Sequence, residues 1–378
     1  MHLFGKVERA TFVARPNRFT VECVLKGKRV TAYLPNPGRL WELMIPGATV
    51  YLERAAAAER KLSFTAVAVE RSGIPVMLHT HRTNDVAAAL IEENRIPGLE
   101  GFRITGREVR LNRSRVDFRL ERGREEILLE VKSCTLFGSR VAMFPDAVTA
   151  RGRRHLEELA RIPGKGKRGA ILFIVHWPHA EYFLPEYHTD LPFSLSFLEA
   201  RDKLTILTAA VGWKGDLSRE DSVTPLTVPW EVIAREAKDR GSYLIILRLS
   251  RRRVLSVGKL GRVAFPKGYY VYCGSAKKNL TGRIARHRRL RKKHFWHIDY
   301  LREAGEFVAA LPVRTGDDLE CEIARSVEKL GEVPVPSFGA SDCSCPSHLV
   351  KMPHNPLYSA KFHYLLQYYR MDRLFTDS

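Results

Sequence analysis

Short runs of alternating apolar and polar residues fill the first part of the chain. They lie at residues 19–25, 29–34, 48–52 and 64–69, with turn signals rich in glycine and proline between them. Alternation with a period of two is typical of strands that bury one face. The pattern predicts a small all-β barrel or sandwich over residues 1–80, and the scattered basic residues would suit an OB-like barrel that holds single strands of nucleic acid.

From residue 81 the pattern changes to helices that alternate with strands. The predicted elements are a helix at 85–94, hairpin strands at 115–120 and 127–134, a helix from about 147 to 161, and a buried strand at 170–175. This order indicates an α/β layer arrangement over residues 81–225.

A third unit is predicted after a linker at residues 226–240, which contains Pro229. Residues 241–378 begin with an apolar strand, followed by a glycine-rich hairpin and a strongly basic helix from about 280 to 293. The expected fold class is therefore a multidomain α/β protein.

Length and composition support this division. The chain has 378 residues, of which 45% are hydrophobic, so several ordinary cores can form. Its six cysteines are too few for a disulfide scaffold in a chain of this length. Charged residues near the start interrupt any secretory segment, and no apolar run could cross a bilayer. We therefore expect a cytoplasmic protein that has no membrane segment, and no protein partner is evident.

The charge is strongly positive, with a formal net value of +20. From residue 231 onward there are 27 Lys and Arg against 15 Asp and Glu, a net of +12 in the shorter part of the chain. Such an excess favours a polyanionic partner, and nucleic acid is the first candidate. DNA is favoured over RNA, and single-stranded or branched forms are both compatible with the pattern.

A first chemical site is predicted on the hairpin of the middle domain. Glu130 and Lys132 alternate along one strand and project to the same side, and Asp117 lies on the partner strand. Two converging carboxylates can hold Mg²⁺ or Mn²⁺, and a lysine beside them can orient water or offset phosphate charge. On the triplet alone, a solvated strand face with an ion pair is the commoner meaning.

Residues 1–230 resemble the sugar fermentation stimulation protein A family over their whole length. The matching segments are residues 33–41, 92–99, 116–118, 130–136 and 144–155. The resemblance implies an OB-like barrel joined to a restriction-endonuclease-like domain of the PD-(D/E)xK type, with Asp117, Glu130 and Lys132 as catalytic-type residues and Glu93 as a support for the metal. Arg151, Arg153, Arg154 and His155 open the following helix, where they could grip phosphates or simply face solvent.

A second chemical site is predicted in the third unit. Tyr243 lies in the apolar strand and Tyr272 in a Tyr-Cys-Gly motif, while Arg283 and His287 are four residues apart and share a helical face. Glu320 lies on a later helix, with Glu322 as an alternative. A one-metal phosphodiesterase needs a carboxylate for the ion, a base for water and a cation for phosphate, and these residues supply all three types.

Residues 241–378 resemble the uncharacterised domain related to GIY-YIG nucleases. The matching segments are residues 268–276, 283–287, 296–301, 320–321 and 338–349. About thirty residues separate the two tyrosines, which is longer than is typical, and we attribute the difference to an insertion in the hairpin. The resemblance implies a second site that also uses one Mg²⁺ or Mn²⁺.

Nine Lys or Arg and no acid occur between Lys277 and Lys293. Phosphate contact explains such a stretch better than an ordinary surface does. The predicted nucleic-acid-binding residues are Arg151, Arg154, Lys277, Lys278, Arg286, Arg288, Arg289 and Arg291.

A Cys343-x-Cys345-x₂-His348 motif follows, with Cys321 or Cys273 as a further thiol. A single Cys-x-Cys is a weak zinc pattern, and a tight loop of buried thiols is the favoured interpretation. The sequence leaves two main hypotheses for the function. The first is a metal-dependent nuclease with two sites, which a cleavage assay would test. The second is a non-catalytic DNA-binding regulatory protein that retains nuclease folds. An RNA-binding factor is a third and poorer reading.

Overall fold

The computed structural model describes residues 3–54, 62–111, 114–162, 164 and 166–376. Contacts divide the chain into two compact units. The first is Met1–Glu186 with Pro192–Ile233, and the second is Tyr187–Leu191 with Ala234–Ser378. The barrel and the middle domain predicted from the sequence thus share one unit.

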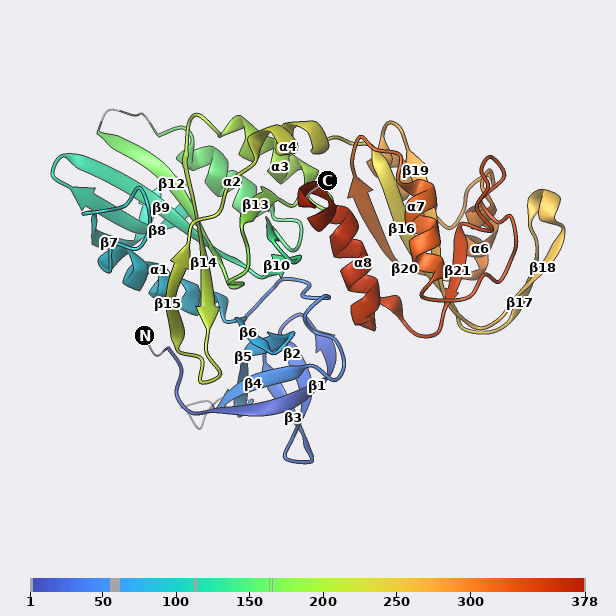
Figure 1. Ribbon diagram of the computed structural model, residues 1–378, viewed down its shortest axis with the longest axis horizontal. Helices are drawn as coiled ribbons and strands as arrows, with labels where there is room; N and C mark the ends of the chain where they lie inside the picture. Colours follow the sequence, from blue (N-terminus) through green and yellow to red (C-terminus); the bar gives the residue numbers. More distant parts are fainter. Residues whose placement is uncertain (1–2, 55–61, 112–113, 163, 165, 377–378) are drawn as a thin grey trace. The chain divides into compact units, whose positions relative to one another are not determined.

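The first sheet is an OB-like barrel, as the alternating pattern predicted (Figure 1). Its six strands follow the order β3-β2-β1-β4-β5-β6. A parallel pairing of β3 with β5, in which Ala32 lies opposite Phe64, closes the sheet on itself. The strands are β1 (Val7–Asn17), β2 (Thr20–Leu25), β3 (Lys28–Tyr33), β4 (Thr49–Arg54), β5 (Phe64–Arg71) and β6 (Ile74–Met77).

A second six-stranded sheet in the same unit has the order β15-β14-β12-β9-β8-β7. Parallel pairing joins β9 to β12 and β12 to β14, and the outer strands are antiparallel. This is the mixed sheet expected of a restriction-endonuclease-like domain. The strands are β7 (Arg103–Leu111), β8 (Ser114–Arg122), β9 (Glu125–Cys134), β12 (Lys167–Val175), β14 (Thr205–Trp213) and β15 (Arg219–Thr224).

Helices cover both faces of this sheet (Figure 1). Helix α1 (Thr83–Glu92) buries Leu90 and Ile91 against Leu129 and Leu172. On the other face, Phe173 packs against Phe197 of α3 (Leu191–Glu199), with 6.1 Å between the ring centroids. The remaining elements of this unit are α2 (Ala150–Leu159), the start of α4 (Trp230–Glu236), and the three-stranded sheet β10 (Leu136–Phe137), β11 (Val141–Phe144) and β13 (Tyr182–Pro185).

The second unit is built on a four-stranded antiparallel sheet with the order β20-β16-β19-β21. A separate hairpin of β17 (Arg253–Ser256) and β18 (Arg262–Phe265) lies between the two tyrosines in sequence, where the additional length was expected. The other elements are β16 (Gly241–Leu249), β19 (Gly268–Ala276), α5 (Leu280–Arg288), α6 (His297–Ala304), β20 (Glu306–Arg314), α7 (Glu320–Glu328), β21 (Leu349–Met352) and α8 (Ala360–Arg370).

The basic helix is shorter than its composition predicted. It ends at Arg288 instead of near residue 293, and Arg289 is already extended. The reason is twofold. A run of like charges disfavours further helix, and Lys292 turns back so that its ammonium donates to the carbonyls of Arg286 and His287 at 3.2 and 2.9 Å. These carbonyls are among those that a helix leaves unbonded at its carboxyl end.

The predicted linker at 226–240 contains a short charged helix, as its sequence suggested. Helix α4 occupies its middle, and the boundary between units falls inside this helix, after Ile233. In the part of the chain that the structure describes, no helix is long and apolar enough to cross a membrane.

Candidate functional site

Asp117, Glu130 and Lys132 project from the same face of the sheet in the first unit. Phe118 pairs with Leu129, and both belong to the core on the α1 side. Because side chains alternate along a strand, Asp117 on β8 and Glu130 on β9 point to the opposite face. The sequence prediction that the hairpin brings these groups to one side therefore agrees with the register.

Glu130 is the centre of this first cluster. Its Oε1 receives a short hydrogen bond from the Lys132 ammonium and lies 2.7 Å from His155 Nδ1 on α2. Its Oε2 is buried and has no hydrogen-bond partner among the described residues. A buried carboxylate oxygen without a partner is costly, so this oxygen marks the position where a further ligand would be stabilised.

Asp117 is held in place from two directions. Asn84 donates its amide to Oδ1 and the backbone N–H of Val131 donates to Oδ2, both at 2.7 Å. Burial and the neighbouring charge of Glu130 raise the pKa of Asp117. Burial also opposes ionisation of Glu130, but its bond with His155 and the charge of Lys132 outweigh this and lower its pKa. The two carboxyl groups therefore have different pKa values, and Glu130 loses its proton at a lower pH than Asp117 does.

Other residues predicted around this cluster have different surroundings. His155 contacts Glu130, whereas Arg151 and Arg154 are exposed on α2. Glu93 accepts a hydrogen bond of 2.6 Å from the buried Arg219, and no contact joins it to Asp117 or Glu130 in the described ranges.

In the second unit, Tyr243 and His287 form the centre of another polar cluster. The Tyr243 hydroxyl lies 2.9 Å from His287 Nε2. The ring of Tyr243 crosses β19 at Gly274, where a Cβ atom would lie only 2.5 Å from the hydroxyl. This contact explains the glycine of the Tyr-Cys-Gly motif. The ring centroid of Tyr272 lies 6.5 Å from that of Tyr243.

Asp299 on α6 is a member of this cluster that the sequence reasoning did not single out. It is 1% exposed, and its Oδ1 lies 3.4 Å from His287 Nδ1. Arg286 and Lys292 also reach its carboxylate, at 3.0 Å each. Asp299 therefore orients His287 from the side opposite Tyr243. Its one available signal was the matched segment at 296–301.

Asp299→Asn should lower the free energy of unfolding of the second unit by about 3–5 kcal/mol, because it leaves buried cations without their counter-charge. The surroundings of Asp299 hold its pKa well below the usual range, since the nearby His287 ring and hydrogen bonds from two backbone N–H groups outweigh burial. The stability it contributes is therefore present above its unfolded pKa of about 3.9 and lost as pH falls through the lower folded pKa. Denaturant unfolding from pH 7 to pH 3 measures this.

The control for this prediction is Glu306→Gln, which removes an exposed pair with Arg248 and should cost under about 1 kcal/mol. The difference in free energy of unfolding between wild type and Asp299→Asn should become smaller below about pH 4. A gap that stays constant with pH would contradict the proposed role of the charge.

Glu320, Arg283 and the two tyrosines line one cavity of about 340 Å³. The Arg283 guanidinium stacks over Trp296 at 4.2 Å from the ring centroid. Glu320 accepts a short hydrogen bond from Ser275, and its Oε1 lies 2.9 Å from His348 Nδ1. These two partners outweigh burial and lower the pKa of Glu320. Four of the five predicted catalytic-type residues of the second unit thus line one cavity, and the fifth, His287, is buried next to it against Tyr243.

Glu322, the alternative to Glu320, lies elsewhere. Its Oε1 accepts a hydrogen bond from Tyr369 of α8 at 3.1 Å. The cavity that contains Glu320 does not include it.

The basic residues after β19 fall into two groups. Arg286 points inward to Asp299 and Trp296. The second group is exposed and has no acidic partner in the described part of the chain; it comprises Lys277, Lys278, Arg288, Arg289 and Arg291.

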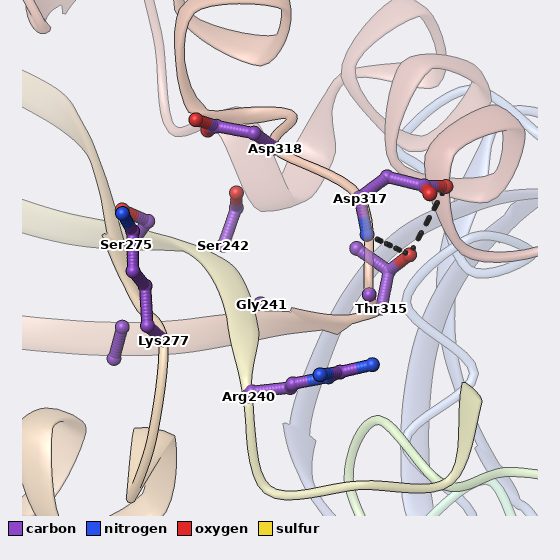
Figure 2. A pocket seen from close by; sticks show the side chains of 10 residues that line it. Arg240, Gly241, Ser242, Ser275, Lys277, Thr315, Asp317 and Asp318 are labelled. Carbon is purple, nitrogen blue, oxygen red and sulfur yellow. Dashed lines mark hydrogen bonds between the residues drawn. The ribbon is translucent and has the colours of Figure 1, made fainter. Parts of the chain in front are cut away.

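A smaller hollow of about 240 Å³ adjoins the cavity and shares Ser275 with it (Figure 2). Arg240, Lys277, Asp317 and Asp318 line it, and Asp317 bonds Thr315. Lys277 also belongs to the exposed basic group, but Asp317 and Asp318 give the hollow a mixture of charges.

An OB-like barrel, a restriction-endonuclease-like domain and a GIY-YIG-related domain define this as a multidomain protein of nuclease-type folds. The chain belongs to the sugar fermentation stimulation protein family. Residues 13–78 match the SfsA N-terminal OB domain, and residues 81–215 match the sugar fermentation stimulation protein RE domain. Residues 242–369 match the domain of unknown function DUF123, the GIY-YIG-related domain.

Individual relatives cover the first unit. A sugar fermentation stimulation protein homolog of Methanothermobacter thermautotrophicus is 42% identical over 194 residues, which is 51% of this chain and 81% of the relative. A homolog of Moorella thermoacetica is 40% identical over 51% of this chain and 84% of the relative. The structure of Pyrococcus furiosus SfsA in complex with Ca²⁺ is 30% identical, with a TM-score of 0.55, over 59% of this chain and 96% of that chain.

Proposed function

We propose that this protein is a nucleic-acid-binding phosphodiesterase with two separate sites, each using one Mg²⁺ or Mn²⁺, and that DNA is its substrate. The observation that carries the proposal is the buried, unpartnered Oε2 of Glu130 beside Asp117 and Lys132. A carboxylate oxygen in such a position is suited to a hard divalent cation. The reduced cytoplasm is the proposed setting.

At the first site, Asp117 and Glu130 would hold the ion, which would polarise the phosphate and lower the pKa of a bound water molecule. Lys132 donates a hydrogen bond to Glu130, and its ammonium can stabilise the negative charge that develops on the phosphate. His155 is buried, and its Nδ1 contacts Glu130 Oε1 and so fixes the orientation of the carboxylate. Support for a divalent ion comes from the SfsA relative whose structure contains Ca²⁺.

At the second site, Glu320 would hold the ion and Arg283 would neutralise phosphate charge. Burial raises the pKa values of both Tyr243 and Tyr272, so both hydroxyls remain protonated at neutral pH. A protonated tyrosine is not itself a base. Tyr243 can nevertheless pass its proton to His287, which Asp299 orients, and the Tyr243–His287 pair is therefore the proposed base.

The test is digestion of single-stranded, duplex, flapped and RNA substrates with Mg²⁺ or Mn²⁺. We expect cleavage of at least one DNA substrate and none in EDTA. A Glu130→Gln/Glu320→Gln double variant, prepared in parallel, controls for contaminating nucleases. Equal cleavage by the double variant would contradict the proposal.

A second candidate function is non-catalytic DNA binding with a regulatory role. The exposed basic group in the second unit favours it, because such charges provide affinity without chemistry. Binding of DNA without cleavage of any substrate by any metal would select this function.

A further inference from the structure

Four potential metal ligands converge beside the second cavity. The ligand atoms of Cys321, Cys343, Cys345 and His348 all lie within 4.8 Å of one another. In the described ranges this is the one group of three or more such side chains gathered around a common point. Cys321 comes from α7, and the other three come from the irregular segment before β21.

The spacing within this group fits a tetrahedral ion. His348 Nε2 lies 3.4 Å from Cys343 Sγ and 3.9 Å from Cys321 Sγ. Zinc bonds of about 2.3 Å to sulfur and 2.0 Å to nitrogen place neighbouring ligand atoms roughly 3.5–3.8 Å apart. Three sulfurs and one imidazole nitrogen are also a donor set typical of closed, structural zinc sites.

The segment that carries three of these ligands has no regular secondary structure. Between α7 and β21 the chain runs for about twenty residues with no regular element of its own, which is uncommon inside a compact domain. Val335 and Phe338 anchor the early part of this segment in the core, and backbone bonds such as those from His348 N to Phe338 O and from Cys273 N to His348 O, at 2.8 and 2.9 Å, fix further points. A bound ion would join this segment to α7 at a single point.

We propose that Cys321, Cys343, Cys345 and His348 bind one Zn²⁺ ion, and that this ion positions Glu320 through His348. The three thiols lose their protons to solvent when the ion binds, so that three thiolates and one neutral imidazole surround it. Cys273, the other thiol considered from the sequence, is buried in β19 and is not part of the group.

His348 links the group of metal ligands to Glu320. With Nε2 facing the sulfurs, its Nδ1 lies 2.9 Å from Glu320 Oε1. A metal-bound histidine commonly donates its other ring N–H to a carboxylate, which fixes both groups. The side chain of Arg325 interacts with Cys345 and carries a positive charge that can balance the net negative charge of three thiolates around Zn²⁺.

The first experiment measures metal in the full-length protein, purified without chelators from zinc-supplemented medium. Elemental analysis should find about one zinc per chain. Cobalt substitution should give intense visible bands of tetrahedral Co²⁺ with thiolate charge transfer in the near ultraviolet. Cys343→Ser and Cys345→Ser should lower the bound zinc several-fold, whereas Cys273→Ser should retain it.

Zinc-free wild-type protein whose cysteines all react as free thiols overturns the proposal. Equal zinc in wild type and in both serine variants overturns it too, because the metal would then lie elsewhere. If a serine variant fails to fold, the wild-type protein decides alone, by release of zinc when its thiols are titrated with a mercurial. Zinc that stays bound while all the thiols react is the contrary result.

His348→Cys tests the positioning of Glu320 separately from the binding of zinc. The positioning role rests on the proposed function of the second site. This variant keeps four ligands and should retain zinc, with a cobalt spectrum shifted toward four sulfurs. It removes the contact with Glu320 and should lower cleavage at the second site by about 10- to 100-fold. Retained zinc with unchanged cleavage refutes the positioning role but not the zinc site. If no cleavage exists in wild type, zinc content still tests the site.

Discussion

Glu130→Gln should lower the rate of cleavage at the first site by about 10²-fold or more and leave the second site unchanged, and Glu320→Gln should do the reverse. Each glutamine keeps the shape of the side chain but removes the charge that would bind a divalent ion. At Glu130 it also disturbs the bonds from Lys132 and His155. Rates on the substrate preferred by each site provide the measurement.

The expectation of independence follows from where the residues lie. Asp117, Glu130, Lys132 and His155 belong to the first unit, and the residues around Glu320 belong to the second. Each set already contains a carboxylate, a cation and a histidine. Neither set needs a residue from the other to bind one ion.

Two substitutions control for unspecific loss of charge. Glu121→Gln alters an exposed glutamate of the same hairpin, and Glu322→Gln alters the neighbour of Glu320 that bonds Tyr369. Both should retain full activity. Loss of every activity in a folded Glu130→Gln or Glu320→Gln variant would require one composite site, and the two-site proposal would then be wrong.

Joint replacement of Arg288, Arg289 and Arg291 by alanine should flatten the salt dependence of DNA binding by about two to three units of slope. Each phosphate that a cation neutralises contributes about −0.9 to the slope of log affinity against log salt on duplex DNA, and about −0.7 on single strands. All three arginines are exposed at or beyond the end of α5. Fluorescence anisotropy across a salt series measures the slope.

The matched control removes three exposed cations of the same unit, Arg251, Arg252 and Lys259. It lowers the net charge equally, so it shows how much of the effect is unspecific. Arg288 also packs over Phe307, at 5.3 Å from the ring centroid, and thermal unfolding should therefore accompany the titration. An unchanged slope in the arginine variant, or an equal change in the control, would place phosphate contact elsewhere.

The sequence by itself determined the local features. Period-two alternation predicted the strands of the barrel, because each strand has one buried face. Alternation along β9 likewise placed Glu130 and Lys132 on one side, and the four-residue spacing placed Arg283 and His287 on one helical face. The family motifs then indicated the domain types, which the matches to the OB and RE domains confirm.

Only the tertiary structure decided which distant groups meet. His155 closes on Glu130 across 25 residues of sequence, and Asp299 reaches His287 from another helix. Cys321 joins Cys343, Cys345 and His348 although the motif alone favoured a loop of buried thiols. The end of α5 at Arg288 depends on Lys292 and the buried Asp299. Sequence periodicity reports which face of an element is buried, but the partner across a packed interface depends on how the elements pack.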